Sequence, residues 1–254
     1  MMAQSRQTKA LEATVAALQR RWGARAIYRL GDTPESDVPV CPTGLDALDD
    51  ALGIGGLPRG KFSELIGYGT AGQATVAARV LAQAQGGGQQ VAYVDVGATV
   101  DIDNLVRCGV CLEGLTILRP QGFTHALAMT GDLLRAGGVA AVVFDRVHDL
   151  YLLTGSDAHA AFHRAVRDWT PVIAHSLNTF LFITEVSAPE VYPGDLPLPY
   201  MASVRLAFRR LRWLQRGARV VGYAAEVTVI KNRLGPPHQR VTLEIVREDG
   251  ITME

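Results

Sequence analysis

The stretch Glu64-Leu-Ile-Gly67-Tyr-Gly69-Thr-Ala-Gly72-Gln-Ala-Thr75 joins the end of a strand, a glycine-rich turn and the start of a helix. The residues before the turn, Lys61 to Ile66, alternate in polarity and are rich in β-formers, which predicts a strand. The residues after it, Val76 to Gln85, are rich in alanine and place their larger apolar side chains on one helical face.

A strand–loop–helix of this kind can bind phosphate, because glycines let backbone N–H groups turn inward and the helix N-terminus adds positive potential. The expected pattern is G-x-x-x-x-G-K-[ST], and Gly67 to Gly72 fit its first six positions. Gln73 stands where the lysine should reach the phosphates, and Ala74 stands where a hydroxyl should hold Mg²⁺. Thr75 carries a hydroxyl, but it lies one position after the one where the pattern has Ser or Thr. On spacing alone, an ordinary glycine-rich turn is the alternative.

The composition limits the classes of protein. With 254 residues and 48% hydrophobic residues, one large domain, or one domain with a small appendage, is expected. The 25 Lys and Arg equal the 25 Asp and Glu, so no global charge indicates a nucleic-acid or membrane partner. Without a leader or a run of 18 apolar residues, neither export nor a membrane span is predicted, and a cytoplasmic location, associated with the nucleoid, is expected.

Two pairs of residues have the spacing of metal half-sites, but no metal site is predicted. Cys108 and Cys111 have no second pair at a matching distance, and with Cys41 they form no disulfide framework. His159 and His163 are spaced i,i+4 but lack an intervening acidic residue and a third ligand. Buried thiols and a surface histidine pair are the simpler interpretations.

The first 41 residues differ from the rest of the chain. Lys9 to Trp22 predict an amphipathic helix, and a short strand is expected over Ala26 to Leu30. A helix this short is marginal alone in water, so its apolar stripe should pack on its own core or on another subunit. The residues assigned to such a contact are Leu11, Val15, Leu18, Ile27 and Tyr28.

From Pro42 onward, strands alternate with helices. The expected strands are 61–66, 90–96, 115–118, 139–144 and 179–184, and the expected helices are 45–52, 76–85, 125–135 and 157–177. Apolar strands separated by helices predict a parallel sheet covered on both faces. The segments 202–214, 223–231 and 240–247 instead predict antiparallel strands joined by Gly/Pro turns.

Two acidic residues end apolar strands of the predicted sheet. Asp145 follows Ala141-Val-Val-Phe, and Glu185 follows Phe180-Leu-Phe-Ile-Thr. Because ligands of parallel sheets bind beyond the carboxyl ends of the strands, both should cluster near the glycine loop. An aspartate in this position can orient Mg²⁺, although it is also a common turn residue. With no lysine opposite these carboxylates, triphosphate binding should be unfavourable without extra cations.

The order of segments resembles the bacterial RecA recombinase core. The resemblance is carried by Pro42 to Gly60 (PTGLDALDDALGIGGLPRG), Trp22 to Gly31, Ala202 to Leu206 and Val229 to Arg233. It implies a RecA-type P-loop ATPase core of α/β class, with a largely parallel sheet between helices, antiparallel C-terminal strands and an N-terminal helix–strand extension. The implied division is a docking segment, 1–41, and a core, 42–254. The family's C-terminal DNA-gathering domain is expected to be absent.

The resemblance also assigns residues. Gly97 stands where the family has the glutamate that activates water, and glycine cannot act as a general base. Asp101 matches an adenine contact, while Asn104 replaces the stacking aromatic residue. Glu185 stands at the glutamine that senses the γ-phosphate. Lys231 and Arg233 match cations that reach the neighbouring subunit's ATP; they are equally well explained as solvated strand residues. ATP hydrolysis is therefore not expected.

DNA binding in the family's manner is not expected either. The segments matching the two DNA-binding loops, 151–157 and 187–200, contain no basic residue. A possible substitute is the arginine-rich strand that contains Arg205, Arg209, Arg210 and Arg212, interleaved with apolar residues. The alternative is a half-buried hairpin with solvated arginines.

The predicted function is that of a RecA-like protein that has kept the fold and lost ATP hydrolysis. It resembles ImuA-type accessory proteins, which act in error-prone translesion synthesis after DNA damage. The implied partners are RecA or a RecA-like filament, a translesion polymerase subunit and possibly DNA. No cofactor is expected, and ATP with Mg²⁺ should bind weakly if at all. The alternative is a divergent RecA paralogue that binds DNA and ATP in recombinational repair.

Overall fold

The computed structural model describes residues 2–23, 38–147, 156–186, 192, 196–246 and 250–253. The chain divides into two compact units, Met1–Asp37 and Val38–Glu254. The first contains α1 (Met2–Trp22), which confirms the predicted helix and extends it toward the N-terminus. Leu11 and Leu18 are exposed on it. The strand predicted over 26–30, with Ile27 and Tyr28, lies outside the described residues.

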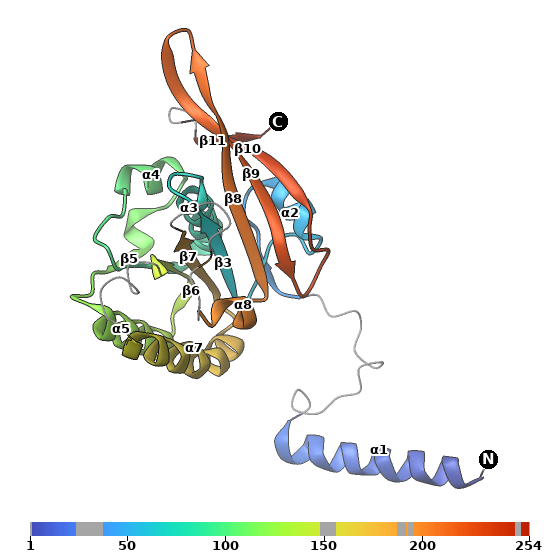
Figure 1. The fold of residues 1–254 in the computed structure, drawn as a ribbon. Helices are drawn as coiled ribbons and strands as arrows, with labels where there is room; N and C mark the ends of the chain where they lie inside the picture. Colours follow the sequence, from blue (N-terminus) through green and yellow to red (C-terminus); the bar gives the residue numbers. More distant parts are fainter. Residues whose placement is uncertain are drawn as a thin grey trace. The chain divides into compact units, whose positions relative to one another are not determined.

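The second unit is built on a nine-stranded sheet with the order β11-β10-β9-β8-β3-β7-β6-β4-β5 (Figure 1). The strands β5, β4, β6, β7, β3 and β8 are parallel neighbours, and β8, β9, β10 and β11 pair antiparallel. Their bounds are β3 Lys61–Gly67, β4 Gln90–Asp95, β5 Leu115–Leu118, β6 Val139–Asp145, β7 Thr179–Glu185, β8 Val204–Arg216, β9 Arg219–Asn232, β10 Arg240–Val246 and β11 Gly250–Met253. The predicted parallel sheet with an antiparallel C-terminal part is confirmed.

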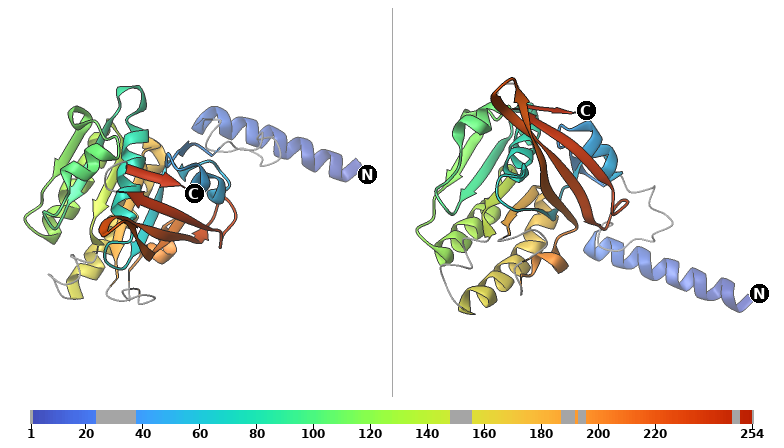
Figure 2. Two further views of the ribbon diagram at one scale, coloured as in Figure 1. Left: turned by 90° about the horizontal axis from the view of Figure 1, so that it is seen from above. Right: turned by 45° about the horizontal axis from the view of Figure 1, so that its top comes forward.

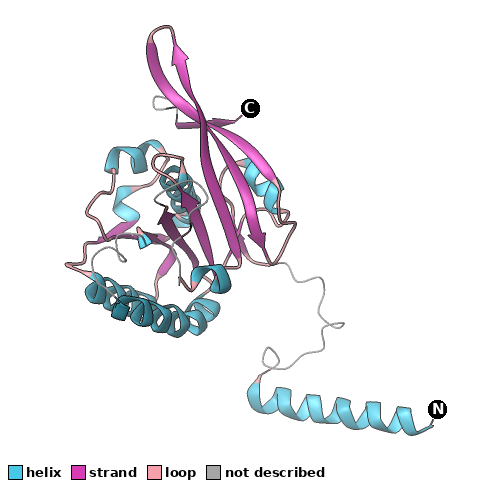
Figure 3. Ribbon diagram, in the orientation of Figure 1, coloured by secondary structure: helices cyan, strands magenta, loops and turns pink. Residues whose placement is uncertain are grey.

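Helices cover the sheet on two sides, and Figure 3 separates them from the strands by colour. Those described are α2 Asp46–Leu52, α3 Gln73–Ala84, α4 Ile102–Arg107, α5 Phe123–Ala136, α7 Ser156–Ser176 and α8 Leu198–Met201. On one side, α2, α3 and α4 contribute to one core cluster; α5, α7 and the turn at α8 contribute to a second. The two views in Figure 2 show α5 and α7 side by side.

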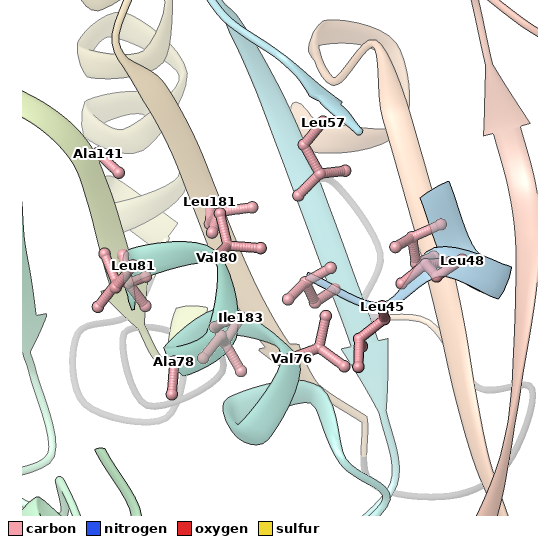
Figure 4. Packing of buried hydrophobic residues seen from close by; sticks show 14 of the residues in the cluster. Leu45, Leu48, Leu57, Val76, Ala78, Val80, Leu81, Ala141, Leu181 and Ile183 are labelled. Carbon is pink, nitrogen blue, oxygen red and sulfur yellow. The ribbon is translucent and has the colours of Figure 1, made fainter. Parts of the chain in front are cut away.

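The first core cluster lies between α3 and the sheet (Figure 4). Val76, Val80 and Leu81 of α3 are fully buried against Leu181 and Ile183 of β7. The second cluster is aromatic: Phe180 and Phe182 have ring centroids 4.8 Å apart. Apolar side chains on both faces of β7 explain why this strand is apolar throughout its sequence.

Five short elements are absent from the predicted pattern. The structure adds α4, α8, β11 and a small sheet in which β1 (Val40–Cys41) pairs with β2 (Leu57–Pro58). Segments this short carry too few residues for a periodic pattern, so the sequence did not indicate them. None of the described helices has the length and apolar character needed to cross a membrane.

Candidate nucleotide cleft

The loop between β3 and α3 has the backbone of a phosphate-binding loop. Gly69 and Gly72 have φ values of +56° and +109°, a region that favours glycine. A β-carbon at Gly72 would lie 2.6 Å from Ile245 Cδ1 of β10, so a side chain here would displace the end of that isoleucine. The helix begins at Gln73 and runs back along the core cluster.

The side chain of Gln73 fills the inside of this loop. Its Nε2 donates to the carbonyl of Gly69 at 3.3 Å, and its Oε1 accepts from the backbone N–H of Ala71 at 3.3 Å. Gln73 is only 6% exposed, and a β-carbon at Gly67 would overlap its amide. The loop therefore satisfies its own polar groups with a neutral amide in place of a cation.

A cleft of about 290 Å³ opens beside the loop. It brings together seven of the predicted site residues: Gly69, Gly72, Gln73, Ala74, Thr75, Asp145 and Glu185. Thr70, Thr99, Arg146, Ile183 and Tyr223 also line it. Gly67 lies at the end of β3 and lines a neighbouring groove, and Asp101 is not among the described residues that line the cleft.

Asp145 is bound to a tyrosine of the neighbouring strand. The Tyr93 hydroxyl donates to Asp145 Oδ2 at 2.5 Å, and both residues are buried. Burial, together with the negative charge of Asp145, raises the pKa of the Tyr93 phenol, so it stays a neutral donor. The carboxylate that would orient Mg²⁺ therefore already accepts a hydrogen bond.

Arg146 was missed by sequence reasoning, and it corrects the expectation that the cleft has no cation. Its Nη1 makes an ion pair with Glu185 Oε2, and the two side chains are 29% and 28% exposed. An arginine directly after Asp145 was visible in the sequence, but only pairing of β6 with β7 brings it to Glu185. The cation is thus present and neutralised by a carboxylate.

The loop after β4 has Gly97 where the resemblance implies a glutamate. Asp95 is buried and accepts from the backbone N–H groups of Thr99 at 2.8 Å and Val100 at 3.3 Å. Its other oxygen pairs with Arg119 at 3.3 Å. These contacts fix the turn that contains Gly97. With Gln73 and Ala74 in the loop, the residues present do not fit a Mg²⁺–triphosphate.

Asp101 has a structural role that its sequence position did not indicate. Its Oδ1 accepts from the backbone N–H of Asn104 at 2.9 Å, which caps the N-terminus of α4. We expect Asp101→Ala to lower the free energy of unfolding by about 1 kcal/mol, because a cap hydrogen bond is lost. Chemical denaturation measures it, with Asp103→Ala as the control. An unchanged stability would contradict the capping role.

The predicted inter-subunit cations lie at the far end of β9. Lys231 Nζ donates to the carbonyls of Pro199 at 2.7 Å and Tyr200 at 3.3 Å, and Arg233 donates to Tyr200 at 2.6 Å. Burial and the neighbouring Arg233 and Arg205 lower the pKa of Lys231. Both residues are held against α8 and are absent from the cleft's described lining. Their role between subunits stays a prediction.

The four arginines assigned to DNA have partners within the sheet. Arg205 pairs with the buried Glu64 at 2.6 Å, Arg209 with Glu226 at 3.0 Å and Arg212 with Glu244 at 3.0 Å. Arg210 lies over the Trp213 ring, 4.3 Å from its centroid. Three of the four charges are therefore compensated by carboxylates, and the DNA-binding prediction stays a prediction.

No metal cluster occurs among the described His, Cys, Asp and Glu residues. Cys41 and Cys108 are buried free thiols, and burial raises the pKa of each. Cys111 is exposed, and its Sγ contacts Glu113 at 3.0 Å.

A glycine loop between a central parallel strand and a helix, with acidic residues ending the neighbouring strands, defines an α/β core of the P-loop fold. A family model described as "RecA N-terminal domain" matches residues 9–252. The chain belongs to the RecA family.

The relatives agree with this assignment. Protein RecA of Streptomyces avermitilis is 34% identical over 271 residues, which cover 100% of this chain and 72% of that protein. Protein RecA of Kineococcus radiotolerans is 34% identical over 272 residues, covering 100% and 78%. The crystal structure of the RadB recombinase superposes with a TM-score of 0.68 at 20% identity, covering 84% of this chain and 98% of that one. This last likeness shows the fold alone.

Proposed function

We propose that this RecA-family protein is a non-catalytic accessory subunit in the DNA damage response. It would act in the cytoplasm, at the nucleoid, by docking on RecA or a RecA-like filament or on an error-prone translesion polymerase assembly, in the manner of ImuA-type proteins. In this role the RecA core is a scaffold, and no nucleotide is turned over.

The observation that carries the proposal is the Gln73 side chain folded into the loop. A triphosphate needs cations at this position, because backbone N–H groups alone compensate little of its charge. The loop instead closes on a neutral amide, and Arg146, the cation in the described lining of the cleft, is paired with Glu185. In addition, Gly97 stands where the family has its general base, and glycine cannot take that role.

Two surfaces support docking. On α1, Leu11 is 56% and Trp22 is 62% exposed, as expected for an apolar stripe that another protein covers. In the second unit, Tyr200 is 76% exposed beside Lys231 and Arg233. Aromatic residues next to arginines are common at the centres of protein interfaces.

Two measurements test the proposal together. We expect the purified protein to show no ATP turnover above background, with or without single-stranded DNA. We also expect a pull-down from damaged cells to recover RecA or a translesion polymerase, and to lose it when Leu11 and Leu18 are changed to Ser. Brisk turnover abolished by Asp145→Ala, or recovery of neither partner, would overturn the proposal.

One observation favours a second candidate, a divergent RecA paralogue that still binds ATP and DNA. Arg146 gives the cleft a cation, and an anion that displaced Glu185 would meet its guanidinium. Tight Mg²⁺-dependent ATP binding in isothermal titration, lost in Arg146→Ala, would favour this candidate. DNA affinity that falls steeply with salt and is lost in an Arg209→Ala, Arg210→Ala double variant would favour it further.

A further inference from the structure

The antiparallel part of the sheet has one face covered by helix and core and one face that forms a groove. Val204, Leu206 and Phe208 of β8 belong to the core cluster that includes α2 and α3. Because side chains alternate along a strand, Arg205, Ala207 and Arg209 point to the other face. There they line a groove of about 770 Å³ together with residues of β3, β9 and β10; Figure 1 shows these strands.

The floor of the groove is apolar, and apolar side chains at its sides are exposed. Ile66 and Ala207 lie in it, and Ile230 and Tyr68 are 36% and 55% exposed at its sides. Apolar side chains exposed to water in a concave site are energetically unfavourable in a monomer, and they commonly mark a binding surface.

The charges at the rim do not balance. Arg205 is compensated by Glu64, and Arg209 by Glu226. Among the described residues, Arg210 and Arg240 have no carboxylate partner: Arg210 donates to the carbonyl of Thr70 at 3.2 Å and lies over Trp213. The groove therefore combines an apolar floor with two uncompensated positive charges.

We infer that this groove binds an acidic segment of a partner protein that carries at least one large apolar side chain. The apolar side chain covers the floor, and carboxylates beside it pair with Arg210 and Arg240. A nucleic-acid backbone fits less well. It needs a track of several free cations, whereas Glu226 stands in the groove wall and the floor offers apolar area.

The inference rests on the proposed docking function and adds the chemistry of the partner, and its test uses no repair protein. Random peptides displayed on phage are selected on the purified full chain, and the enriched peptides are titrated by fluorescence anisotropy. We expect enrichment of Asp and Glu flanking an aromatic or aliphatic residue. We expect an Arg210→Glu, Arg240→Glu double variant to weaken binding about tenfold or more, and Ile230→Ser to weaken it as well.

The matched control is an Arg164→Glu, Arg167→Glu double variant. It makes the same change in net charge on the exposed side of α7, outside the groove, and should bind the peptides as the wild type does. Circular dichroism confirms that each variant is folded. Peptides without acidic enrichment, or equal binding by both double variants, would overturn the inference. So would labelled oligo(dT) that binds in preference to the peptides and depends on Arg210 and Arg240.

The outcomes separate the two proposals. If acidic peptides fail while the pull-down recovers RecA or a polymerase, the groove inference is wrong and the accessory function stands. If the peptides bind and the pull-down recovers neither, the groove stands and its partner lies in another process.

Discussion

A Gln73→Lys, Ala74→Thr double substitution is expected to raise the affinity for Mg²⁺-ATP by about 10- to 100-fold. Hydrogen bonds to charged groups contribute about 1.5 to 3 kcal/mol each, and each 1.4 kcal/mol is about tenfold in affinity. Lysine brings the missing charge into the loop and removes the amide that now bonds Gly69 and Ala71. Isothermal titration with and without Mg²⁺ measures the change.

Ala74→Thr alone is the control, because it adds the hydroxyl and leaves Gln73 in the loop. It should bind ATP about as weakly as the wild type. The double variant should still not hydrolyse ATP, since Gly97 supplies no base. If the wild type already binds as tightly as the double variant, Gln73 is not what weakens the site.

Replacement of Glu64 by leucine is expected to lower the free energy of unfolding by about 3–5 kcal/mol, because it leaves buried polar partners without a charge to bind. Glu64 is fully buried on β3 and accepts from Thr184 at 2.6 Å, Tyr192 at 2.5 Å and Arg205 at 2.6 Å. Burial and the charge of Glu64 raise the pKa of the Tyr192 phenol, which keeps it a neutral donor. Urea denaturation followed by circular dichroism measures the loss.

Asp132→Ala provides the comparison. It also removes an ion pair, with Arg135, but both side chains are more than half exposed. Such pairs contribute about 0–1 kcal/mol, so this variant should unfold almost as the wild type does. A similar decrease in the free energy of unfolding in the two variants would show that the burial of Glu64 does not determine the size of its effect.

The glycine loop of this RecA-family core closes on its own Gln73 side chain, and we propose that it no longer serves as a triphosphate site. Gly69 and Gly72 keep the positive φ angles that favour glycine in this loop. Four side chains of the cleft's lining already have partners: Gln73 bonds the loop, Asp145 accepts from Tyr93, and Arg146 pairs with Glu185. Groups that are already paired give a bound nucleotide little to gain.

Local pattern was sufficient for most of the secondary structure. Strand β5 has the bounds that alternation and turn residues predicted, and α7 differs from its prediction by one residue at each end. The gathering of Asp145 and Glu185 at the glycine loop was also predictable, because parallel strands end at one edge of the sheet. The position of these two acidic residues beside the loop could therefore be predicted without knowledge of the side-chain contacts.

Contacts between residues far apart in the chain could not be predicted in this way. Glu64 meets Arg205 across 141 positions, and Arg146 meets Glu185 across 39. Periodicity and spacing fix strands and their ends because these depend on neighbouring residues. The partner of a buried charge depends on strand order and register, and these are set when the sheet closes around its core. That is why the sequence assigned Arg205 to a possible DNA contact without indicating that it pairs with the buried Glu64.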